Sequence, residues 1–249
     1  MIEMNGLYRF ASPATFYPLA GKLLPWFYIA AIVLAVIGLY IGLIASPTDF
    51  QQGESYRIIY IHVPAAWMSM FVYLLMSGYG ILYLSFNTRL SAMMMCALAP
   101  TGAMFTFVAL WTGALWGRPT WGAYWVWDAR LTSELILLFL YLGFMALRAA
   151  IEDPRRADKA AALLAIVGAV NVPIIYFSVQ WWNTLHQGAS VSLTASPKMA
   201  QIMLTGMLIM SLSAWAYTIA IVLSRVRVII LEREAGAEWL NRRMSGKSK

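Results

Sequence analysis

Long apolar runs alternate with short polar breaks along the chain, and six of the runs could each cross a lipid bilayer. The hydrocarbon core of a bilayer is about 30 Å thick, which an apolar helix of about 20 residues spans. The runs lie at about 26–45, 64–86, 92–115, 132–150, 160–180 and 200–224. Turn-forming segments at 46–49, 87–89 and 152–156 separate some of them. The pattern predicts an all-α integral membrane protein: one domain, 1–249, of six transmembrane helices.

Three finer features follow from the same pattern. The first run is too long for the core of a signal peptide, so we expect it to remain as a span. Prolines 13, 18 and 25 favour an interfacial lead-in before that span, and Asn171 with Pro173 predicts a kink in the fifth. The basic tail at 225–249 should extend the sixth span as a helix or lie on the membrane surface.

The distribution of lysine and arginine predicts the orientation. Six spans place both termini on one side, and that side carries 14 of the 18 Lys and Arg residues, whereas the other carries only Arg57, Arg118, Arg130 and Lys198. Basic residues accumulate in cytoplasmic loops, so we expect cytoplasmic termini. Loops at about 46–63, 116–131 and 181–199 then face outward. The net charge of +7 reflects this topology rather than affinity for nucleic acid.

Composition excludes several kinds of site. The chain is 61% hydrophobic and 12% charged, which leaves no room for a soluble domain between the spans. Its single cysteine, Cys96, lies inside an apolar run, so no disulfide framework, paired-cysteine redox motif or cysteine zinc site is available.

The loop after the third span is unusually rich in tryptophan. Residues 116–128 contain four tryptophans, namely Trp116, Trp121, Trp125 and Trp127. Charged residues at 118, 128, 130 and 134 would each cost about 2.5–3.5 kcal/mol at the bilayer centre, so this segment should lie at the membrane surface. An aromatic belt is one interpretation, because tryptophan favours that level in any membrane protein. A flat platform for a planar ligand is the other.

Both histidines of the chain, His62 and His186, fall in other outward loops. A single histidine is more often structural than a ligand, but neutral imidazole is a common axial ligand of haem iron. Arg57, Arg118 and Arg130 could then pair with haem propionates. Asp128 could contact the ligand, although it is better explained as the cap of the fourth span, with Glu134 in the first turn.

The string from Trp116 through Trp121, Gly122, Trp125, Trp127 and Asp128 to Glu134 resembles the signature of the tryptophan-rich "WWD" haem-handling family. With six spans and one histidine in each flanking outward loop, the whole chain is similar to the haem exporter protein C group of that family. The resemblance implies a protein of the bacterial inner membrane that binds haem (haem b) at its periplasmic face. It also implies delivery to a periplasmic haem chaperone, cytochrome c maturation protein E, for c-type cytochrome biogenesis.

The resemblance further implies partners and roles. An ATP-binding protein (A), a second membrane protein (B) and a small single-span protein (D) of the same system would complete an ABC-type complex. His62 and His186 would be the axial ligands, and the four tryptophans with Asp128 would bind haem and engage the chaperone. The larger cytochrome c synthases of the family carry four functional histidines, so two argue against synthase activity. No phosphate-binding motif for ATP occurs, so ATP hydrolysis would come from a partner. The resemblance implies that this chain handles and transfers haem and is not an enzyme.

Two other functions fit parts of the pattern. A b-type cytochrome subunit of a respiratory complex would use two histidines for electron transfer, but it would hold them inside the spans. A small-solute or proton transporter needs polar groups along a midplane path, and the spans offer few.

Overall fold

The computed structural model describes residues 11–182, 184, 186 and 199–245, and helices joined by turns make up this part of the chain. The elements are α1 (Pro13–Tyr40), η2 (Ile41–Ala45), η3 (Glu54–Ile58), α2 (Ile59–Phe86), α3 (Arg89–Trp121), α4 (Ala129–Ala150), α5 (Pro154–Gly168), α6 (Asn171–Trp181), α7 (Gln201–Arg233) and α8 (Glu238–Met244). Six helical stretches among them are long and apolar enough to cross a membrane, with α1–η2, η3–α2 and α5–α6 counting as one each. The predicted fold class is confirmed.

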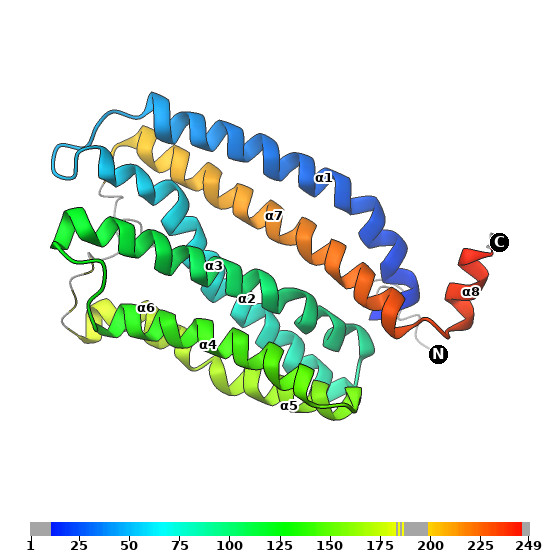
Figure 1. Ribbon diagram of the computed structural model, residues 1–249. Helices are drawn as coiled ribbons and strands as arrows, with labels where there is room; N and C mark the ends of the chain where they lie inside the picture. Colours follow the sequence, from blue (N-terminus) through cyan, green and yellow to red (C-terminus); the bar gives the residue numbers. More distant parts are fainter. Residues whose placement is uncertain (1–10, 183, 185, 187–198, 246–249) are drawn as a thin grey trace, which may run out of the picture.

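The long helices run side by side as an elongated bundle, with α1 packed along α7 and α2 along α3 (Figure 1). The α2–α3 and α4–α5 turns lie at the same end as the described ends of the chain, where α8 projects from the bundle. The α1–α2 and α3–α4 connections lie at the opposite end. We call this second end the distal end.

Most of the helices extend beyond their apolar runs. α3 has 33 residues, so it is about 50 Å long and exceeds the bilayer core by several turns. As a result, the distal loops are shorter than predicted. Residues 54–62 are already helical before the second apolar run, and α3 continues to Trp121, where Gly122 ends it with a φ of 80°. Most of the third distal loop, predicted at 181–199, lies outside the described residues.

The start of the chain differs from prediction. Instead of an interfacial lead-in, α1 begins at Pro13, capped by Ser12, and runs continuously past Pro18 and Pro25. Proline suits the first turn of a helix because its missing N–H is not needed there. Membrane helices also tolerate interior prolines when neighbouring groups satisfy the freed backbone.

The predicted kink in the fifth span is confirmed as a break. α5 ends at Gly168 and α6 begins at Asn171, where the side-chain amide donates to the Ser133 carbonyl of α4 at 2.9 Å. Pro173 lies in the first turn of α6, where it has no helical hydrogen bond to lose. The predicted helical extension of the sixth span is confirmed only up to Arg233, where α7 ends. A turn then separates α7 from α8.

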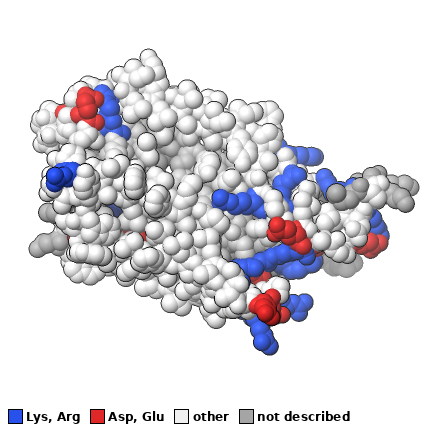
Figure 2. All heavy atoms as spheres, in the orientation of Figure 1, with Lys and Arg blue, Asp and Glu red and all other residues white. Residues whose placement is uncertain are grey.

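Charged side chains gather at the two ends and are sparse between them on the face seen in Figure 2. At the end with the chain termini, Asp158 is buried and pairs with Arg148 and Arg233; its oxygen lies 3.0 Å from Arg233. These contacts connect α4, α5 and α7. The distal end carries the candidate site.

Candidate functional site

His62 lies in the first turn of α2 rather than in a loop, and its ring faces α3. The Nδ1 atom is 3.0 Å from the Thr112 hydroxyl oxygen. That hydroxyl donates its only hydrogen to the Val108 carbonyl at 2.6 Å, so it must accept from His62. Nδ1 therefore carries the proton, and the lone pair is on Nε2. The Trp116 indole contacts the same imidazole edge to face, with ring centroids 5.6 Å apart.

His186 lies beyond the end of α6 and is held by a carboxylate. Its Nδ1 is 3.4 Å from the Asp128 Oδ2, and its ring centroid is 4.7 Å from that of Trp121. Burial lowers the pKa of His186 below its ordinary value, although the charge of Asp128 opposes the shift. The imidazole is therefore neutral at physiological pH. Because a carboxylate only accepts, Nδ1 carries the proton here too, and Nε2 keeps its lone pair.

Asp128 makes two contacts with one side chain. Its Oδ1 accepts from the Leu131 backbone N–H at 2.8 Å and so caps α4, as predicted, while its Oδ2 faces His186. An N-cap aspartate is fixed by the helix it begins. The start of α4 therefore determines where the partner of His186 lies.

Arg130 is a charged group that acts on both histidines. His186 also lies within electrostatic range of His62. The guanidinium is part-buried, donates to the Ile175 carbonyl at 3.3 Å, and is attracted by the charges of Glu134 and Asp128. The structure thus brings together both histidines, Asp128 and Arg130.

The other two arginines have different surroundings. Arg57 donates to the Gly42 carbonyl at 2.6 Å and the Ser46 carbonyl at 3.1 Å, which fastens η3 to the end of the first span. Arg118 is exposed and bonds the Gly122 carbonyl, with its guanidinium 5.7 Å from the Tyr124 ring centroid. Their side chains stabilise the distal loops.

The four tryptophans do not form one flat surface. Trp116 and Trp121 lie on the last turns of α3, and the Trp116 indole donates to Gln52 in the first distal loop at 2.7 Å. Trp125 and Trp127 follow Gly122, and their planes meet at 76°. Trp127 is 77% exposed, whereas the Trp125 indole nitrogen is buried without a hydrogen-bond partner among the described residues.

The expectation that Glu134 lies in the first turn of α4 is wrong. It lies in the second turn, is 7% exposed, and accepts from the Ser69 hydroxyl of α2 at 2.7 Å. A carboxylate inside a span is unusual because burial without a partner is costly. The position of Glu134 within the fourth apolar run could therefore have indicated a buried hydrogen-bond partner. Thr112 and Gln52 were also missed, because no local pattern reveals a partner on another element.

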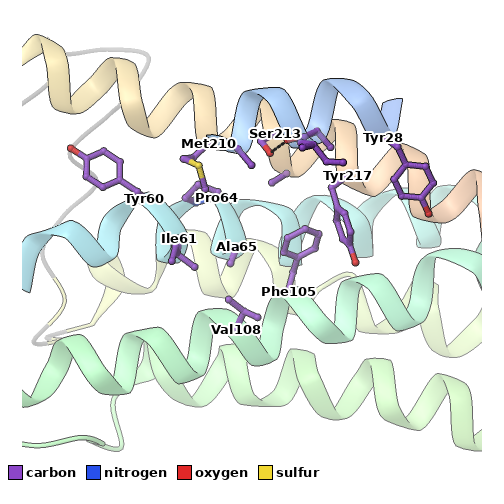
Figure 3. A pocket seen from close by; sticks show the side chains of 14 residues that line it. Tyr28, Tyr60, Ile61, Pro64, Ala65, Phe105, Val108, Met210, Ser213 and Tyr217 are labelled. Carbon is purple, nitrogen blue, oxygen red and sulfur yellow. Dashed lines mark hydrogen bonds between the residues drawn. The ribbon is translucent and has the colours of Figure 1, made fainter. Parts of the chain in front are cut away.

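Two cavities of about 400 Å³ each lie between the spans, away from this cluster. The first is bounded by α1, α2, α3 and α7, with Tyr28, Tyr60 and Phe105 on its wall; Ser213 bonds the Ala31 carbonyl beside it (Figure 3). The second lies between α2 and α6. Neither is lined by His62 or His186.

Comparison with known proteins identifies the family. The sequence model described as "Heme exporter protein C" matches residues 6–241. A protein of that name from Bradyrhizobium diazoefficiens is 48% identical over 223 residues, which cover 90% of this chain and 84% of the relative. One from Escherichia coli K12 is 44% identical over 239 residues, covering 94% and 95%. A Marchantia polymorpha protein described as a putative cytochrome c biosynthesis ccmC-like mitochondrial protein is 47% identical over 159 residues, or 64% of this chain and 67% of the relative. This chain therefore belongs to the heme exporter protein C family.

Proposed function

We propose that this protein binds haem at the distal end, with His62 and His186 as axial ligands, and passes it to a periplasmic haem chaperone. The observation that carries the proposal is the matched presentation of the two imidazoles. Each is held through Nδ1, by Thr112 or by Asp128, which leaves Nε2 as the donor atom. Histidines that ligate metals typically donate their other N–H in this way.

The surroundings fit a macrocycle better than a bare ion. Among the described residues, no cluster of three or more His, Cys, Asp or Glu side chains could hold a metal. Two histidines suffice for iron whose other four ligands come from a porphyrin. Arg130 would neutralise one haem propionate, and Arg57 or Arg118 would neutralise the second. The Trp125 indole N–H, which has no partner among the described residues, would gain an acceptor on the cargo. Trp116, Trp121 and Trp127 would contact the ring.

The charge distribution supports the orientation. The termini would be cytoplasmic and the distal end periplasmic, with the chain in the bacterial inner membrane. Trp127, at 77% exposure, is available for contact with the chaperone (cytochrome c maturation protein E). ATP hydrolysis would come from the ATP-binding protein A of an ABC-type complex that also contains the membrane protein B and the single-span protein D.

Electron transfer by a b-type cytochrome remains the alternative, and the positions of the histidines weigh against it. His62 is the fourth residue of α2 and His186 follows the end of α6, so neither lies near the middle of a span. A haem at this level suits exchange with a soluble partner.

The absorption spectrum of the purified full-length protein tests the proposal. We expect a six-coordinate, low-spin haem spectrum in the wild type, and its loss in the double variant His62→Ala/His186→Ala. A wild type that binds no added haem, or a double variant with an unchanged spectrum, would exclude this site.

A further inference from the structure

The two histidines of the proposed site have unequal partners. His62 donates to a neutral hydroxyl, that of Thr112. His186 donates to the carboxylate of Asp128. Both partners fix the same tautomer, but only one of them carries charge.

This difference changes the strength of each imidazole as a ligand. A hydrogen bond to a carboxylate raises the basicity of the imidazole, so it donates more strongly to iron. Hydrogen bonds to charged acceptors are also stronger than those to neutral ones. Asp128 remains in place because its other oxygen caps α4. His186 is therefore the stronger donor.

The packing of the two imidazoles also differs, and this difference again favours His186 over His62 as the lasting iron ligand. The Nδ1–Cε1 edge of His62 is pressed against α3 so closely that a Cβ atom added at Gly113 would lie 3.1 Å from Cε1. An imidazole fixed between two helices cannot follow an iron atom that moves outward. His186 lies beyond the end of its helix.

We propose that His186 is the retained ligand and that His62 releases the iron first when the cargo leaves for the chaperone. This inference rests on the proposed function. The step breaks one Fe–N bond, returns the electron pair to Nε2 of His62, and changes no oxidation state. The vacated position is taken by water or by a donor group of the chaperone.

Haem titration of the single-histidine variants of the full-length protein tests the order in which the two histidines release the iron. We expect His62→Ala to keep most of its haem affinity through His186. His186→Ala should lose at least the roughly tenfold that loss of a ligand's hydrogen-bond partner alone typically costs. Adding Asp128→Asn to His62→Ala should remove the higher haem affinity that His62→Ala has over His186→Ala. Asp153→Asn is the matched control, because Asp153 caps α5 in the same way at the other end of the bundle.

The reduction potential of the bound haem iron is a second measurement, and a loss of structure would not produce the same change in it. A carboxylate bonded to the ligand stabilises ferric iron, so Asp128→Asn alone should raise the potential, while Asp153→Asn should not. The inference fails if His186→Ala binds haem as well as His62→Ala does, or if the two aspartate variants have equal potentials. If the wild type binds no haem, the proposed function fails instead.

Discussion

At the scale of single residues, Arg130 differs from the other arginines of the distal end. Arg57 is bonded to backbone carbonyls and Arg118 is exposed. Arg130 is part-buried, is attracted by the charges of Glu134 and Asp128, and acts on both histidines. A buried cation is tolerated only with counter-charges. Glu134, held by Ser69, and Asp128 supply them close to both histidines. In the proposed function, Arg130 would use this position to pair with a haem propionate.

We predict that Arg130→Gln discriminates between haem and its dimethyl ester. The variant should bind haem at least about tenfold more weakly, because a hydrogen bond to a charged group contributes about 1.5–3 kcal/mol. It should bind the ester, which has no propionate charge, nearly as the wild type does. Titration followed by absorbance measures both affinities. Arg155→Gln, an exposed position at the other end of the bundle, serves as the control. Equal losses for both ligands would show that Arg130 only maintains the fold.

At the scale of elements, the apolar runs predicted the existence of the helices but not their ends. A run marks only the part of a helix inside the bilayer, because there every backbone group must be satisfied internally. Beyond it, α2 begins before His62 and α3 continues through Trp121, supported by contacts such as Gln52 with Trp116. Such contacts join elements far apart in sequence. For this reason Thr112, the partner of His62, could not be predicted.

The close approach of α2 and α3 beside the ligand gives a second prediction. Gly113→Ala should move the His62 ring by a few tenths of an ångström, because the added methyl would lie 3.1 Å from Cε1. We expect an altered haem spectrum and a several-fold weaker affinity. The unfolding temperature should stay close to that of the wild type, since alanine favours a helix by about 1 kcal/mol. In Gly143→Ala, where the nearest atom would be 3.8 Å away, the spectrum should not change.

The contact between α3 and α4 should instead affect stability. A methyl at Gly102 would overlap the ring of Tyr141, whose hydroxyl donates to the Ser69 carbonyl at 2.8 Å. Gly102→Ala should therefore destabilise the bundle by about 1–3 kcal/mol, the usual cost of overpacking. Thermal unfolding in detergent measures the loss. Gly78→Ala, with open space around the added methyl, should unfold at or above the wild-type temperature.

At the scale of the whole molecule, the two ends carry different chemistry. The end with α8 has a buried Asp158 shared by two arginines, and the distal end has the histidines, the tryptophans and Arg130. The sequence could predict this separation, because the connections between six successive spans lie alternately on the two sides of a membrane. It could not predict that the histidines share a tautomer or differ in their partners, since both properties depend on tertiary contacts.

The proposed function also requires that the distal end faces the periplasm, and this orientation can be tested directly. In a cysteine-free background made by Cys96→Ala, Gln51→Cys at the distal end should react with a membrane-impermeant maleimide when only the outer membrane is permeable. Arg155→Cys, at the start of α5, should react only after the inner membrane is disrupted. Both positions are exposed in the structure, so burial would not explain a missing reaction. The reverse pattern would place the histidines on the cytoplasmic side, where a periplasmic chaperone could not reach them.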